Sequence, residues 1–202
     1  MAHDHQHDHD HEHEDDREGG ATEEELRAEV EAEAVRRYAL AQIRQYGDPA
    51  LRLTAREVID FDDDLRRLAD RMVGLMHDAQ GVGLAATQVG VLRRVFVFQP
   101  DEDGPRVVVN PTVAERGDEK MTDSEGCLSL QGVHVPVERA LALTIEGKDP
   151  SGEEVRHELA GYAARVAQHE LDHLNGVLVI DLTDEEHRKE ALATLRPRVS
   201  LR

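Results

Sequence analysis

Apolar residues recur at intervals of three or four positions in four stretches of the chain, and this spacing is typical of helices that bury one face. The predicted helices cover about 23–45, 62–79, 162–174 and 184–195. Thr22 and Glu25 form the capping-box pattern that marks a helix start. Gly176 follows the third helix, and glycine suits the left-handed backbone position after a helix end.

Between the second and third helices, short runs rich in Val and Leu alternate with Gly, Pro and Asp, a pattern typical of strands joined by turns. The predicted strands cover 93–98, 106–109, 133–137 and 140–146. Helices precede and follow these strands, and no regular strand–helix alternation is present. The pattern therefore predicts an α+β fold, in which small, mostly antiparallel sheets surround a central helix, with N-terminal helices and a C-terminal helix.

The N-terminus differs in composition from the remainder of the chain. Over 1–20, histidines alternate with acidic residues, and this composition predicts a disordered tail. Residues 21–42 then form a helical extension, and 43–202 form one domain. Alternating imidazoles and carboxylates can bind Zn, Ni or Cu loosely, but a solvated tail explains the same composition.

Composition and charge exclude several classes of protein. The 202 residues include 24 basic and 43 acidic side chains, for a net charge of −19, which disfavours DNA or general nucleic-acid binding. The single cysteine, Cys127, excludes an internal disulfide and suits a reducing compartment. No apolar stretch is long enough to cross a bilayer, and the acidic N-terminus is unlike a signal peptide. We therefore expect a cytoplasmic protein without membrane contact.

The clearest chemical pattern is the run HELDH at 169–173, an HExxH sequence on the third predicted helix. Positions i and i+4 lie on one face of a helix, so His169 and His173 can reach one cation while Glu170 holds a water beside it. This arrangement is typical of metal-dependent hydrolases. Two exposed histidines on an acidic helix are the alternative.

A catalytic divalent metal site usually has three protein ligands and one open position. The long zincin motif would place a third histidine at the position that Val179 occupies, so that protease class is disfavoured. Glu186 or Glu190 on the last helix would supply a carboxylate ligand. Cys127 would supply a thiolate, although a lone cysteine is often a buried structural residue.

A third segment, GVGLAATQVG at 81–90, combines glycines and small residues with Gln88. It fits either a tight loop or a wall along which a substrate backbone lies close to the chain. The segment lacks the Lys and Ser/Thr of a phosphate loop, so nucleotide binding is disfavoured.

Taken together, GVGLAATQVG, EGCLS and QHELDHLNG, in this order and spacing, resemble the three signature motifs of the peptide deformylases. The similarity extends from about Ile43 to at least Asp181, which makes 43–202 the expected catalytic domain. Members of this family remove the formyl group from the N-terminal formylmethionine of newly made polypeptides and release formate. The resemblance implies this hydrolase activity, and the alternative is an HExxH metallopeptidase with a Glu as third ligand.

The resemblance also implies the role of each residue at the reacting centre. Cys127, His169 and His173 correspond to the family's three metal ligands. Glu170 corresponds to its general acid and base. Two groups correspond to the donors that stabilise the oxyanion, namely the Gln88 side chain and the backbone N–H of Leu128.

The substrate is expected to lie extended beside the segment at 81–84, where Gly83 permits close approach of its backbone. Val82 and Val166 correspond to the lining of the pocket for the methionine side chain, and Glu125 lies at a neighbouring family position. Arg165 also lies at a neighbouring position, and a surface charge is the alternative for this residue.

Two positions depart from the family's usual pattern, since Gln131 and His134 stand where Pro and Arg are common. We expect the histidine to affect substrate preference while leaving the metal site intact.

A thiolate with two imidazoles suits one divalent ion per chain, Fe²⁺ as the native metal or else Zn²⁺, Ni²⁺ or Co²⁺. The expected partners are nascent formylated polypeptides. The stretch 187–202 is basic, which predicts a weak contact with ribosomal RNA, and a solvated terminal helix is the alternative.

Overall fold

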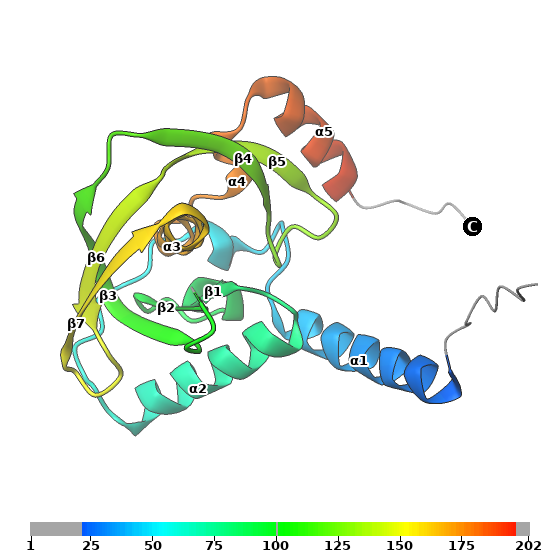
Figure 1. Ribbon diagram of the computed structural model, residues 1–202, viewed down its shortest axis with the longest axis horizontal. Coiled ribbons are helices and arrows are strands. Elements are labelled where there is room, and N and C mark those ends of the chain that lie inside the picture. Colours follow the sequence, from blue (N-terminus) through cyan, green and yellow to red (C-terminus); the bar gives the residue numbers. More distant parts are fainter. Residues whose placement is uncertain (1–21, 100, 197–202) are drawn as a thin grey trace, which may run out of the picture.

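The computed structural model describes residues 22–99 and 101–196, so the predicted disordered tail at 1–20 lies outside the described residues. Figure 1 shows helices and two small antiparallel sheets, as predicted. Before the first strand come α1 (Glu23–Gln42), the short 3₁₀ helix η1 (Pro49–Arg52) and α2 (Asp63–Asp78). After the last strand come α3 (Gly161–Leu174), α4 (Val179–Leu182) and α5 (Glu185–Leu195).

The larger sheet has five antiparallel strands in the order β1-β2-β3-β6-β7. These strands are β1 (Gly83–Ala85), β2 (Val95–Phe98), β3 (Arg106–Arg116), β6 (Ala142–Lys148) and β7 (Glu154–Ala160). A 3₁₀ turn, η2 (Ala86–Val89), follows β1 directly. Among the described strands β1 pairs with β2 alone, so no strand covers its other edge.

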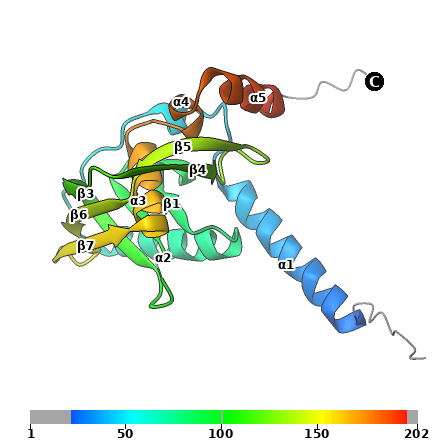
Figure 2. The same ribbon diagram turned by 45° about the horizontal axis from the view of Figure 1, so that its top comes forward.

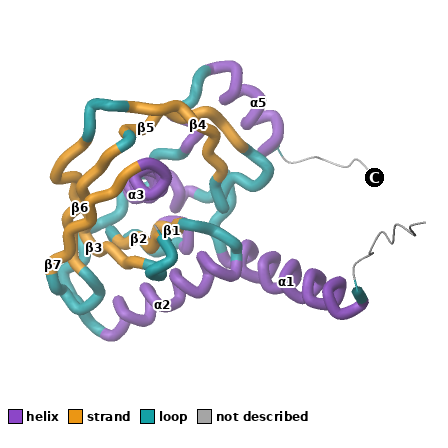
Figure 3. The backbone as a smooth tube through the Cα atoms, in the orientation of Figure 1, coloured by secondary structure: helices purple, strands orange, loops and turns teal. Residues whose placement is uncertain are grey.

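The second sheet is a two-stranded ribbon of β4 (Lys120–Gly126) and β5 (His134–Ala140). Gly126 pairs with His134 at the end of this ribbon, so Cys127 follows β4 immediately. In Figure 3 the ribbon and the larger sheet lie on different sides of α3. This arrangement brings the segment after β4 close to the helix that bears HExxH.

The helix α3 begins at Gly161, whose φ of +55° lies in the left-handed region, directly after β7. Its apolar face packs into a core cluster with β2, in which Ala164, Ala167 and Leu174 meet Phe96 and Phe98. The side chains of this helix are therefore held in place by contacts along most of its length.

The helix α1 extends away from the body of the molecule, as Figure 2 shows. Its capping box between Thr22 and Glu25 forms as predicted. The predicted end at residue 45 is wrong, because the helix stops at Gln42. Ile43 adopts an extended backbone and is 3% exposed, and the N–H of Arg44 donates to the carbonyl of Gln88 at 2.7 Å.

Three strands were not predicted, namely β1, β4 and β7, and the run predicted at 106–109 is the first part of the longer β3. The residues of β4 are mostly polar and exposed, so they lack the alternation that marks a half-buried strand. β1 has only three residues and lies within the glycine-rich segment. Within the described residues, no helix is long and apolar enough to cross a membrane.

Candidate metal centre and active site

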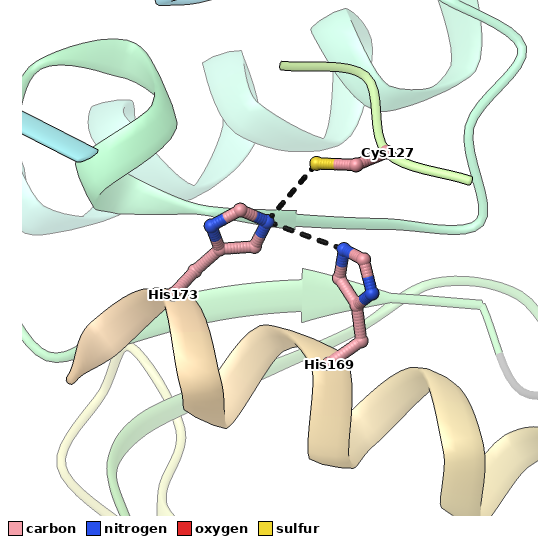
Figure 4. A group of neighbouring side chains, drawn as sticks. All are labelled: Cys127, His169 and His173. Atoms are coloured by element: carbon pink, nitrogen blue, oxygen red, sulfur yellow. Dashed lines mark hydrogen bonds between the residues drawn. The ribbon is translucent and has the colours of Figure 1, made fainter. Parts of the chain in front are cut away.

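Cys127, His169 and His173 form one cluster, although they come from two distant parts of the chain (Figure 4). The Nε2 atom of His173 lies 3.2 Å from the Cys127 sulfur and 3.2 Å from the Nε2 of His169. The three ligand atoms lie within 4.8 Å of one another. In the part of the chain that the structure describes, this is the only such group of His, Cys, Asp and Glu side chains.

The spacing of these atoms fits a single metal ion. Two ligands on a tetrahedral ion with bonds of about 2.0–2.3 Å lie roughly 3.3–3.6 Å apart, close to the observed separations. Cys127 therefore completes the set that the two histidines begin, and the cluster does not include Glu186 or Glu190. One thiolate and two imidazoles are donors that borderline divalent ions accept.

Hydrogen bonding orients His169 toward this cluster. Burial would lower the pKa of His169, but its hydrogen bonds with Cys127 and Glu125 raise it well above the usual value. Its Nδ1 lies 3.1 Å from the Oε2 of Glu125, so a metal-bound, neutral ring would donate from Nδ1 and bind through Nε2. His173 is 1% exposed, and burial is the main cause that holds its pKa well below the usual value. The second ring is thus neutral, as a metal ligand requires.

Glu125 is the centre of a buried ion network. Its carboxylate accepts two hydrogen bonds of 2.9 Å from Arg139 and one of 2.7 Å from Arg165. Burial alone would raise the pKa of Glu125, but the hydrogen bonds and charges of Arg139 and His169 lower it to about 2. Arg139 also pairs with Asp172, one residue before the second histidine. Glu125 is therefore ionised and fully engaged at neutral pH.

The surface-charge alternative for Arg165 is wrong, because this side chain is only 5% exposed and also donates to two backbone carbonyls. Arg139 was missed by the sequence analysis. The signal for it was present, since the alternation in β5 places Arg139 on the same face as Val135 and Val137. A charged residue on the buried face of a strand indicates an ion pair.

Glu170 lies beside the cluster on the same helix, is 3% exposed, and has a pKa that burial raises to about 7. Its Oε2 atom is buried and has no hydrogen-bond partner within the described residues. Gly83 packs directly against this carboxylate, because a Cβ atom built there would come within 2.3 Å of Oε1. The glycine thus permits the β1 backbone to pass next to the acid.

Gln88 is buried in η2 with its amide nitrogen 3.1 Å from the Ser129 hydroxyl and 3.7 Å from the Cys127 sulfur. The backbone N–H of Ala85 donates to the amide oxygen at 2.8 Å, which fixes which end of the amide faces the cluster. The N–H of Leu128 donates to no acceptor among the residues that the structure describes. Both donors therefore adjoin Cys127.

A cavity of about 470 Å³ opens over the cluster. All the site residues predicted from the sequence line it except His173, which lies beneath at 1% exposure. They are Val82, Gly83, Gln88, Glu125, Cys127, Leu128, Val166, His169 and Glu170. His134 and Gln131, the two departures from the family pattern, also line this cavity.

Residues 40–189 match the family model for polypeptide deformylase. The chain belongs to the peptide deformylase family. The peptide deformylase of Thermotoga maritima is 46% identical over 140 residues, which cover 69% of this chain and 85% of the relative. Peptide deformylase 1 of Corynebacterium glutamicum is 44% identical over 161 residues, which cover 78% of this chain and 95% of the relative.

Solved structures of peptide deformylases have the same fold. The crystal structure from Thermotoga maritima has a TM-score of 0.68 at 46% identity and covers 70% of this chain and 96% of its own. The crystal structure from Ehrlichia chaffeensis in complex with actinonin has a TM-score of 0.75 at 33% identity. It covers 79% of this chain and 97% of its own. The family resemblance found in the sequence is thus confirmed, and the metallopeptidase alternative is not favoured.

Proposed function

We propose that this peptide deformylase removes the formyl group from the N-terminal formylmethionine of newly made polypeptides and releases formate. One observation carries the proposal. A single cavity brings together the Cys127, His169 and His173 cluster, the buried Glu170 and the donor Gln88. Metal-dependent hydrolysis of an amide uses these three elements, which are a metal site, a proton carrier and hydrogen-bond donors for an oxyanion.

In this proposal Cys127, His169 and His173 hold one divalent ion, with Fe²⁺ as the native metal and Zn²⁺, Ni²⁺ or Co²⁺ as alternatives. When bound, such an ion polarises a carbonyl oxygen and lowers the pKa of water from about 15.7 toward neutrality. Glu125 supports these three residues by accepting a hydrogen bond from the Nδ1–H of His169. This bond keeps the ring in the tautomer that binds through Nε2.

Glu170 takes the proton from the attacking water and later delivers it to the leaving amine. A carboxyl group with a pKa of about 7 exchanges protons in both directions at neutral pH, which these two steps require. The side-chain amide of Gln88 and the N–H of Leu128 donate hydrogen bonds to the oxygen on which negative charge develops. Because Ala85 holds the Gln88 amide, this donor is oriented before the substrate binds.

The peptide lies extended along the free edge of β1, so that its backbone pairs beside Gly83. Val82 and Val166 line the pocket for the methionine side chain, and the buried Glu125 closes the wall next to it. A formyl carbon carries only a hydrogen besides its nitrogen and oxygen. Walls that fit this group clash with an acetyl methyl and so displace the acetyl carbonyl from the oxyanion donors, and they exclude an internal peptide bond.

The test compares matched peptides that begin with formyl-Met, acetyl-Met or free Met. We expect formate release from the formyl peptide with a preference of at least about a hundredfold, on the order of 3 kcal/mol, over the acetyl peptide. Mass spectrometry should find no internal cleavage of the free peptide. Internal fragments that appear in proportion to the bound metal would instead support an HExxH metallopeptidase.

The proposal assigns catalysis to 43–202, a helical extension to 21–42 and a tail to 1–20, in a cytoplasmic enzyme. A weak contact of 187–202 with ribosomal RNA remains part of the proposal. Within this stretch Arg188 lies 3.4 Å from Asp181, so one cation of the stretch is already paired with a carboxylate. Residues 197–202 lie outside the described residues. Co-sedimentation with ribosomes that persists after removal of 187–202 would overturn this contact.

A further inference from the structure

The N-terminal helix supplies part of the wall of the substrate cavity. The end of α1 is anchored in the core, where Ala39 is 1% exposed and Leu40 is 6% exposed. Arg36 lies four residues before Leu40, so both side chains occupy the same face of the helix. Both of them line the cavity that contains Cys127 and Glu170. The projecting helix therefore holds a guanidinium group at the substrate cavity.

This contribution lies outside the part of the chain that matches the family, because the match begins at residue 40. The pattern of exposure separates Arg36 from its neighbours, since Arg36 is half-buried while Val35 and Arg37 are exposed. Arg36 is thus a feature of this chain that the family likeness does not explain.

Arg36 also carries a charge that is accessible from the cavity. The other Arg and Glu side chains that line the described cavity are Glu125, Arg165 and Glu170, and each of them is at most 5% exposed. Within the described residues, the one carboxylate within 4 Å of Arg36 is the exposed Glu33, at 3.6 Å. This separation is longer than a hydrogen bond, and a pair this exposed is weak.

The segment 80–83, beside which the substrate is proposed to lie, and Arg36 line the same cavity. Within this segment Gly83 packs on Glu170, and Gly81 packs on Leu128. A peptide that lies along it with its formyl group at the ligands extends its following residues into the remainder of the cavity. Gln80 and Gln131, both uncharged, line that remainder together with Arg36.

We infer that Arg36 is a specificity-determining residue that binds a carboxylate side chain, Asp or Glu, among the first residues after the formylated methionine. The inference rests on the proposed function, because it assumes that the cavity binds a formylated peptide. A guanidinium group pairs with a carboxylate through two parallel hydrogen bonds, which adds geometric selectivity to the attraction of the charges.

The experiment uses formyl-Met tetrapeptides with an amidated C-terminus, which carry Glu or Gln at position two, three or four. Formate release gives kcat and KM for the full chain, for Arg36→Gln and for Arg36→Glu. The native chain should prefer Glu at one position by about three- to fivefold in kcat/KM, near the strength of a half-exposed ion pair. The preference should appear in KM and should shrink at high ionic strength.

Arg36→Gln should abolish the preference, and Arg36→Glu should reverse it. Arg37→Gln, on the exposed side of the same turn, is the matched control and should keep both the rate and the preference. Equal values for Glu and Gln at every position in the native chain, or a preference that survives in Arg36→Gln, would overturn the inference alone. Absence of formate from the Gln peptides would overturn the proposed function and this inference with it.

Discussion

Glu125 Oε2 lies 3.1 Å from Nδ1 of His169, on the ring nitrogen opposite the one that faces the other ligands. The same carboxylate is the partner of two buried arginines, Arg139 and Arg165. One residue therefore orients His169 and also contacts both buried arginines that join the β4–β5 ribbon to α3. Damage to this carboxylate affects both the metal site and the stability of the fold.

Glu125→Ala should lower the free energy of unfolding by about 3–5 kcal/mol, because it removes the buried carboxylate that two buried guanidinium groups share. Among the described partners, Arg139 then keeps only Asp172, and Arg165 keeps only backbone carbonyls. Urea denaturation of the metal-loaded chain measures this loss. Glu138→Ala is the control, since Glu138 pairs with Lys120 on the surface of the same ribbon and both side chains are more than half exposed. A loss for Glu125→Ala no larger than that of the control would contradict the buried network.

Glu170→Ala and Cys127→Ala should separate proton transfer from metal binding. Glu170 is no member of the ligand cluster, so its removal should leave the bound metal in place and abolish nearly all turnover. Cys127→Ala removes one of three ligands and should lose the metal itself. Elemental analysis and formate release on both variants check this, and an active Glu170→Ala variant would show that the assigned proton carrier is wrong.

Much of this site could be predicted because its chemistry is local. His169 and His173 are four residues apart on a helix, and the period of the helix alone places them on one face. The third ligand was not determined by local spacing, since Cys127 and two glutamates remained as candidates until the family motifs were compared. Only the fold, which sets the end of β4 against α3, joins the cysteine to the histidines.

The support around the site could not be predicted for the same reason. Whether Arg139 meets Glu125 depends on the register of β5 against β4 and on the packing of α3, none of which short-range periodicity contains. β4 was missed because backbone pairing, and not an apolar pattern, maintains it, and β1 was missed because it has only three residues. Propensity predicted helices well, but the end of α1 was decided by burial of Ile43.

Asp181 should make stability depend on pH in the acidic range. Burial alone would raise its pKa, but the hydrogen bonds from Arg52 and from the N–H of Leu178 lower it. A group with a lowered folded pKa contributes stability above its unfolded pKa of about 3.9, and loses the contribution as pH falls through the folded pKa. The pair of Arg52 and Asp181 links η1 to α4.

Asp181→Asn should therefore lower the free energy of unfolding by about 1 kcal/mol near neutrality. Denaturation at a series of pH values should show the difference from the native chain disappearing below about pH 4. Asp70→Asn, on the exposed face of α2, is the control and should change stability little. A difference that stays constant down to strong acid would mean that Asp181 acts through packing instead of charge.

Gly83→Ala tests how closely β1 approaches the proton carrier. A Cβ atom at this position would lie 2.3 Å from Glu170 Oε1 and 2.9 Å from its Cδ. The carboxylate of Glu170 must therefore shift from its observed position. Misplacement of a catalytic group by about 1 Å costs on the order of a hundredfold in rate, so formate release should fall by about this factor.

The metal content should stay unchanged in this variant, because the three atoms nearest to a Cβ at Gly83 all belong to Glu170, which is outside the Cys127, His169 and His173 cluster. Gly74→Ala is the matched control, since a Cβ atom at this exposed position of α2 meets no atom within 4 Å. Alanine favours the helix there, so the control should gain about 0.5–1 kcal/mol of stability and keep full activity. Full activity in metal-loaded Gly83→Ala would show that Glu170 does not need its observed position.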